Sequence, residues 1–508
     1  MTVAAQPASP PMSARVALVP LDDRPRCLQY PVLLGEVADT EVLTPPRVLL
    51  GRSVKTGDGD AIARWLDGLD LVTLDAVVIS TDMLAYGGLA GSRVPRVFEA
   101  DARRRLEALA RLKQRQPNLR VYAFGTILPE APAPEADNDP SRQTGARNRA
   151  INLSLVELAA RGAIDYLVFG QDDGRSSGVS VADRVAIGEA IGKAGVAGRV
   201  VIQSGADQIA MLLLARALAT RFNYQPVVQT VYSSTTAREA EMTVATQVAI
   251  AGARLADRGG VQLLVYASRH ESQDQADAFA SRVARSVSSG GRVVVADLNT
   301  KGGAPGAWLP LIEGLRTRKL LPRLFSYASS NTTEDTIGTA LAQGLLFALA
   351  VDKVAPALPA VGLRVGSAQV RLLLHRFVND FLYEGVVRAQ ATEDFLRPRN
   401  LNPLRLDESG RVLVEQYLVG ELKPLAESLA ADFTAQPWRL PGPSSRRSTV
   451  ALAVKDIEGF ALTLPWGRML EAEIQFRLSA QPQVAMPRPP APRVLPARSR
   501  LTSPGAGS

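Results

Sequence analysis

The chain contains little of the chemistry on which metal centres and covalent catalysis usually depend. Among its 508 residues there is one cysteine, Cys27, and there are two histidines, His270 and His375. One cysteine excludes an internal disulfide and any site built from several cysteine ligands. Two histidines leave almost no room for a histidine-rich metal centre. We therefore expect no resident cofactor; Mg²⁺ or Mn²⁺ on oxygen ligands stays open.

The usual motifs of nucleotide binding are also missing. No Walker A sequence occurs, and no G-x-G-x-x-G follows the first expected strand. A catalytic triad or dyad would need one of the two histidines. His270 follows an expected strand and is a weak candidate, whereas His375 lies in a helical run and is expected to pack or to face solvent.

Charge and hydropathy predict neither a nucleic-acid partner nor a membrane partner. The net charge is +8, but residues 481–508 carry four arginines and no acid, and without them 54 Lys and Arg face 50 Asp and Glu. Nucleic-acid binding needs clustered basic residues, which this balance does not provide. No apolar run approaches the roughly 18 residues of a membrane span. Since residues 1–14 lack the features of a secretory signal, we expect a cytoplasmic location.

Between residues 15 and 330 the chain repeats a short apolar, β-branched run followed by a helical stretch. Buried parallel strands in βα units have this pattern. The ten runs are VALVPLDD, EVLTPP, DAVVISTD, RVYAFGT, DYLVFGQDD, RVVIQSGAD, VVQTVYSS, VQLLVYAS, RVVVADLN and RLFSYASSN. The sequence therefore predicts an α/β protein with two Rossmann-like lobes; the alternative is a TIM-like barrel with extra strands.

The expected boundaries follow changes in this pattern. We expect a disordered N-terminus over 1–14, a first α/β lobe over 15–223, a second over 224–355, a smaller α+β domain over 356–480, and a disordered Pro/Arg-rich tail over 481–508. Within the α+β domain, 362–391 and 412–433 are expected to be helical, while 455–466 and 470–478 alternate as antiparallel strands do. Trp466 and Arg468 are expected either to lie in the core or to reach over the cleft as a lid.

Polar residues follow strand after strand, at the point where parallel strands end. Because these ends meet at one edge of a sheet, we expect the side chains to converge on one cleft. The alternative for any single Asp is a helix N-cap. We assign catalytic roles to Asp22, Asp23, Asp82, Asp172 and Asp173, and substrate-binding roles to Arg24, Tyr86, Gln171, Asp207 and Asn331.

Carboxylate chemistry is what these residues offer. Two carboxyls in a cleft can divide acid and base roles, as in glycoside hydrolysis, without histidine or metal. The leading hypothesis is a hydrolase acting on a small molecule, with a carbohydrate as the first substrate class to test. The alternatives are a non-catalytic small-molecule (sugar) binding protein and a divalent-metal-dependent phosphoesterase.

Five segments together resemble a known family. They are VALVPLDDRP, STDMLAYGGLAGSR, the GQDD and GAD strand ends, SYASSNTTEDTIGTALA and LPWGRMLEAEI. In order and spacing they are similar to the bacterial domain-of-unknown-function family 4127, over residues 15 to 480. The resemblance implies no activity. Its motifs point to the same candidate residues, from Asp22 to Asn331.

Overall fold

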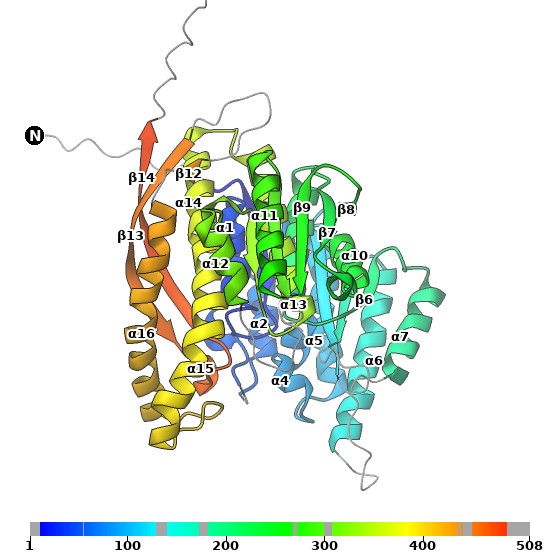
Figure 1. The fold of residues 1–508 in the computed structure, drawn as a ribbon. Helices are drawn as coiled ribbons and strands as arrows, with labels where there is room; N and C mark the ends of the chain where they lie inside the picture. Colours follow the sequence, from blue (N-terminus) through cyan, green and yellow to red (C-terminus); the bar gives the residue numbers. More distant parts are fainter. Residues whose placement is uncertain are drawn as a thin grey trace, which may run out of the picture.

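A computed structural model describes residues 11–53, 55–128, 140–171, 181–267, 272–298, 307–434, 438–439 and 450–484. Two parallel sheets dominate it (Figure 1). The first has the order β2-β1-β3-β4-β5-β6 and contains β1 (Ala14–Val19), β2 (Thr40–Leu43), β3 (Ala76–Ser80), β4 (Arg120–Ile127), β5 (Tyr166–Gln171) and β6 (Val200–Ser204).

The second sheet has the order β11-β10-β9-β7-β8. It contains β7 (Val227–Tyr232), β8 (Arg254–Leu255), β9 (Val261–Ala267), β10 (Arg292–Leu298) and β11 (Ser326–Ala328). Counted from its own first strand, this order is 2-1-3-4-5, which is also how the first sheet begins. Both sheets therefore have the doubly wound topology of flavodoxin-like folds. This confirms the α/β class and the two Rossmann-like units, whereas the alternative of one barrel is wrong.

A third, antiparallel sheet follows near the C-terminus. It consists of β12 (Trp438–Arg439), β13 (Val450–Thr463) and β14 (Glu473–Val484). The antiparallel pair expected over 455–466 and 470–478 is thus confirmed. The expected boundaries of independent domains stay a prediction.

Helices fill three layers around the two parallel sheets. The outer face of the first sheet is covered by α2 (Gly59–Asp67), α3 (Thr81–Tyr86), α5 (Glu99–Arg115), α6 (Pro140–Ala160) and α7 (Val181–Ala194). Between the sheets lie α1 (Gln29–Val37), α8 (Ile209–Arg221), α10 (Glu241–Ile250) and α13 (Thr333–Leu349). Beyond the second sheet lie α11 (Gln273–Ser288), α12 (Leu309–Thr317), the helical segment η6 (Phe377–Val387) and α16 (Glu408–Thr434). The remaining helices are α4 (Leu89–Ser92), α9 (Thr235–Arg238), α14 (Pro359–Arg376) and α15 (Arg388–Gln390).

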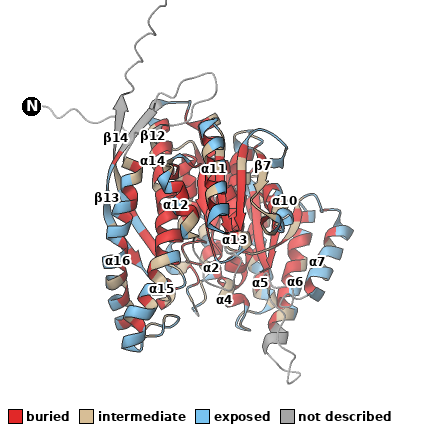
Figure 2. Cartoon of the chain, viewed as in Figure 1, coloured by how far each residue is buried: buried red, intermediate tan, exposed pale blue. Residues whose placement is uncertain are grey.

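The middle layer joins the two sheets through one hydrophobic core. Buried residues of α8 and α13 belong to the same apolar cluster as residues of both sheets. The segment Thr333–Val354 has the length and hydropathy of a membrane span, yet 89% of the 18-residue apolar window within it is buried inside the protein (Figure 2). Its apolar character is therefore explained by packing between two sheets.

Two sequence patterns predict local structures that differ from those observed. The run DARRRLEALARLKQR predicts a helix with an Asp cap at residue 101, but α5 begins at Glu99 with Phe98 at its N-cap and no side-chain cap. The stretch QPWRLPGPSSRRS, residues 436–448, predicts a long surface loop, but Trp438–Arg439 within it pairs with β13. The edge strand β8 has two residues, too few to give an apolar run that the sequence could reveal. In contrast, α8 is buried nearly all round, as its composition predicts.

Candidate functional site

The strand order of the first sheet reverses between β1 and β3, and ligands of doubly wound folds bind at such a reversal. The loop after β1 and the turn after α3 approach each other there through a pair of glycines. At Gly88 a Cβ would lie 3.1 Å from the carbonyl oxygen of Leu21. Gly87 has φ +82°, and its Cβ would lie 2.3 Å from the carbonyl oxygen of Gly57. Only glycine allows this approach without displacing a loop.

Arg24, in the loop after β1, binds three carboxylates, one from the same loop and two from distant parts of the chain. Its Nε lies 2.8 Å from Asp22 Oδ2. Its Nη2 and Nη1 lie 2.7 and 3.0 Å from the two oxygens of Asp207, which follows β6. Nη1 also lies 3.2 Å from Glu471 Oε1. We call these residues, together with the adjacent Cys27, the Arg24 cluster. The structure thus brings together three of the predicted residues, Asp22, Arg24 and Asp207.

The surroundings of two acids in this cluster shift their pKa values in opposite directions. Burial, with the neighbouring charges of Asp207 and Glu471, raises the pKa of Asp22 to about 6, although Arg24 acts in the opposite direction. Asp207 is also buried, but the charge and hydrogen bonds of Arg24 hold its pKa below the usual 3.8. Burial raises the pKa of the Cys27 thiol, so this side chain stays a protonated thiol and is not a nucleophile.

The turn between β13 and β14 packs against this cluster. Trp466 Nε1 donates a hydrogen bond of 2.6 Å to Asp23 Oδ1. The guanidinium carbons of Arg24 and Arg468 lie 5.4 and 4.4 Å from the centre of the Trp466 ring, within cation–π range. Trp466 has φ +63°, a strained conformation for a large side chain. The turn therefore reaches the site, as one of the two sequence interpretations expected; a lid function is not tested by this.

A second group of buried charges surrounds Arg26, two residues after Arg24. We call Arg26, Ser330, Asp335 and Glu384 the Arg26 cluster. Arg26 donates to the Ser330 hydroxyl, lies 3.7 Å from Asp335 and pairs with Glu384 Oε1 at 2.9 Å. Burial first, and then the charge of Asp207, raises the pKa of Asp335 to about 7. The charge of Asp207 in the Arg24 cluster thus acts on an acid of the Arg26 cluster, and we call the two clusters together the junction.

Asn331 lies at the surface end of this junction. It is exposed, and its Oδ1 accepts a hydrogen bond of 3.2 Å from the Ser330 hydroxyl. Glu384 Oε2 is buried and has no hydrogen-bond partner among the residues described. The junction therefore combines an exposed amide with unsatisfied buried carboxyl oxygens.

Asp82 occupies a separate position at the start of α3. Its Oδ1 accepts a hydrogen bond of 3.0 Å from Thr126, and its buried Oδ2 has no partner in the described part of the chain. Burial raises its pKa to about 7. Tyr86, one turn later, lies under the guanidinium of Arg147 at 4.4 Å. The contacts of Asp82 and Tyr86 are thus made with Thr126 and Arg147 and not with the Arg24 cluster.

The alternative that a strand-end Asp caps the following helix is wrong for Asp82 and Asp207. Ser80 caps α3, and α8 begins after Gln208 without a side-chain cap. Asp22 Oδ1 instead accepts the backbone N–H of Arg24 at 3.0 Å, which stabilises the turn.

Several other candidates lie elsewhere. Asp172, Asp173 and His270 are outside the described residues. Gln171 lines a different pocket, together with residues of β6 and α10. His375 is buried, and its Nε2 lies 3.0 Å from the carbonyl oxygen of Ile474. Burial lowers its pKa to about 3. Of the two expected positions, packed or facing solvent, His375 therefore has the packed one.

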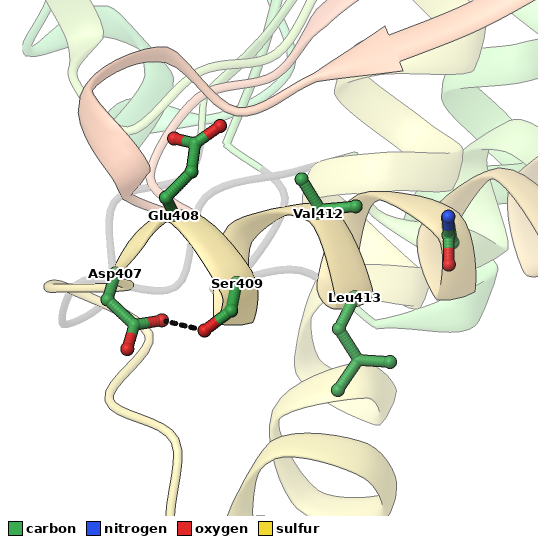
Figure 3. Close-up of a pocket in the computed structure, with 6 residues that line it drawn as sticks. Asp407, Glu408, Ser409, Val412 and Leu413 are labelled. Atoms are coloured by element: carbon green, nitrogen blue, oxygen red, sulfur yellow. Dashed lines mark hydrogen bonds between the residues drawn. The ribbon is translucent and has the colours of Figure 1, made fainter.

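A hollow of about 740 Å³ at the start of α16 is open to solvent (Figure 3). Its polar residues serve the helix: Asp407 Oδ1 accepts from the Ser409 hydroxyl at 3.1 Å and from the Gly410 N–H at 2.7 Å. Val412 and Leu413 line the same hollow. We therefore assign it no ligand.

The residues that the sequence did not reveal are Arg26, Asp335, Glu384 and Glu471. Arg26 and Asp335 could be suspected from the sequence alone, because each follows an apolar strand and lies near a predicted site residue. Those neighbours are Arg24 and Asn331. Glu384 and Glu471 come from a helix and a turn near the C-terminus, and no strand-end pattern could identify them.

The described acids are not arranged to hold a metal ion. In the described ranges no group of three or more His, Cys, Asp or Glu side chains is arranged to hold one. The three acids around Arg24 are instead engaged by its guanidinium.

These features define an α/β protein with two doubly wound parallel sheets and a buried carboxylate–arginine junction. The chain belongs to the family described as protein of unknown function (DUF4127), whose pattern matches residues 16–145 and 134–475. The resemblance seen in the sequence is thereby confirmed. No curated protein matches the chain.

Proposed function

We propose that the protein is a hydrolase that uses carboxyl groups of the Arg24 cluster for acid–base chemistry on a small molecule. The observation that carries the proposal is the opposite behaviour of two acids on one guanidinium: the pKa of Asp22 is raised to about 6 and that of Asp207 is lowered. A pair of titratable groups whose environments separate their pKa values is the usual basis for dividing acid and base roles.

In this mechanism Asp22 is the proton donor and Asp207 the ionised partner. Asp22 gives its proton to the leaving oxygen as the scissile bond breaks. Asp207, which Arg24 holds ionised, faces the positive charge that develops at the reacting carbon. Water supplies the hydroxyl group of the product and returns a proton to Asp22, so that both carboxyls end in their starting states.

The surrounding residues would position this chemistry. Glu471 and Trp466 approach from the β13–β14 turn and limit access to Arg24, whose side chain is 14% exposed. Asp23 is fixed by Trp466 and Arg47, and it has a positioning role. Excluding water in this way strengthens the interactions between the charged groups.

A second candidate function is binding without catalysis. This function is favoured by the low exposure of the acids, since the Asp207 and Glu471 side chains are only 18% and 17% exposed. All three acids of the cluster also already contact Arg24. Because the described acids do not form a metal site, we derive no phosphoesterase step. In either case we propose a carbohydrate as the first ligand class and the cytoplasm as the location.

The test is a panel of p-nitrophenyl glycosides and esters with wild type, Asp22→Asn and Asp207→Asn. Asp274→Asn, an exposed residue on α11, is the matched control. We expect wild type and the control to hydrolyse at least one substrate, and each site variant to lose at least 100-fold in kcat. If wild type is inert on the whole panel but binds a sugar, and Asp207→Asn abolishes that binding, the hydrolase proposal is replaced by the binding function.

A further inference from the structure

A second polar pocket lies between the two sheets, at the edge of the first. It has a volume of about 320 Å³ and opens where β5 and β6 end. Helix α10, from the second unit, lies beside β6 and closes the pocket from the other side (Figure 1). We call it the glutamine pocket; its polar lining is Gln171, Arg184, Gln203, Ser204, Thr243 and Thr246.

Two buried carboxamides form the inner wall. Gln171 and Gln203 are 7% and 6% exposed. The Oε1 of Gln203 has no hydrogen-bond partner among the described residues, and its Nε2 makes only a long contact of 3.5 Å with the carbonyl oxygen of Gly205. A buried amide oxygen without a donor is rare in folded proteins. It is a ready acceptor for a hydroxyl group of a ligand.

The position of this wall is fixed by the backbone. The N–H of Gly205 donates to the carbonyl oxygen of Gln171 at 2.9 Å, so the ends of β5 and β6 are held together. Gly205 has φ +78°, and a Cβ there would lie 2.8 Å from Glu334 Cβ of the second unit. The pocket is therefore preformed, as ligand sites usually are.

Among the described residues that line the pocket, Arg184 is the one charged side chain. It makes no hydrogen bond or ion pair with the described part of the chain. The adjacent Asp183 pairs with Arg149 instead. A guanidinium that has no ion pair with the described residues and lies beside neutral amides and hydroxyls favours an anionic group, above all a carboxylate that can bind in a bidentate manner.

We propose that the glutamine pocket binds a small polyhydroxylated carboxylate, such as a sugar acid. Arg184 binds the carboxylate, while the Gln203 amide and the hydroxyls of Thr243 and Thr246 bind the ligand hydroxyls. Ile202 and the 76% exposed Met242 offer apolar contact to the carbon chain. The site is independent of the proposed hydrolase, because three carboxylates around Arg24 would repel such a ligand there.

The experiment is titration calorimetry of the full chain with sodium D-gluconate, D-glucose and inorganic phosphate. We expect gluconate to bind at least tenfold more tightly than glucose. Arg184→Gln should weaken gluconate binding at least tenfold and leave glucose unchanged, while Thr246→Val should weaken both. Arg282→Gln, an exposed arginine on α11, is the matched control and should bind as wild type does.

Two results would overturn the proposal. One is no detectable gluconate binding, or gluconate binding that neither Arg184→Gln nor Thr246→Val changes. The other is phosphate binding at the same site in preference to gluconate. Asp22→Asn separates this site from the hydrolase: it should bind gluconate as wild type does, even if the protein hydrolyses nothing.

Discussion

The buried carboxyl of Asp82 should make the stability of the protein depend on pH between about 4 and 7. Its pKa is about 7 in the folded protein and 3.8 as an ordinary aspartate. Across this interval the folded chain holds a proton that the unfolded chain has released. Stability contributed by the protonated carboxyl is therefore fully present below pH 3.8 and is lost as the pH rises through 7.

The size of the effect follows from the two pKa values. One pH unit corresponds to 1.36 kcal/mol, so the full interval corresponds to about 4 kcal/mol and the part between pH 5 and 8 to roughly 3 kcal/mol. Asp82→Asn removes the titration while keeping the size of the side chain and an acceptor oxygen for Thr126. An amide that stabilises the fold as the protonated carboxyl does should make the variant more stable than wild type by roughly 2 kcal/mol at pH 5 and by about 4 kcal/mol at pH 8.

Urea unfolding at pH 5 and pH 8, followed by circular dichroism, measures this difference. Asp274→Asn, exposed on α11, is the control and should follow wild type at both pH values. Thr126→Val should move the pH-dependent fall in wild-type stability to higher pH, because the Thr126 hydroxyl favours the ionised carboxylate. An equal change in stability from pH 5 to 8 in wild type and Asp82→Asn would refute the reasoning.

The fold class could be predicted because parallel strands are buried on both faces. β3, for example, is buried at every position and reads as AVVIS without alternation. The strand order could not be predicted in the same way, since βα units look alike whether they add to one edge of a sheet or the other. The reversals at β1/β3 and β7/β9 became visible only from the pairing of strands.

The site was predictable only where its residues follow strands. Asp22, Arg24 and Asp207 do so, and they meet. Arg24 and Glu471 are 447 positions apart, and Glu471 comes from a turn of the antiparallel sheet, where no periodic pattern marks it. The close contact also depends on long side chains that cross between elements. Tertiary packing of this kind leaves no local signal in the sequence.

Three further substitutions test how the site is packed. Arg24→Gln removes the counter-charge of three acids and should lower the free energy of unfolding by about 3–5 kcal/mol at pH 7; in urea titrations the loss should be smaller at pH 5, where the acids gain protons. Trp466→Phe loses the hydrogen bond to Asp23 and should cost about 1–3 kcal/mol with the fold intact by circular dichroism; complete unfolding would instead identify the ring as core. Gly87→Ala should cost more than Gly162→Ala, although both residues have similar positive φ values of 82° and 79°. A Cβ at Gly87 would meet backbone at 2.3 Å, whereas the space at Gly162 is open. The left-handed conformation alone costs about 1–2 kcal/mol, so equal losses of stability in thermal or urea unfolding would show that the close approach of the two loops adds nothing.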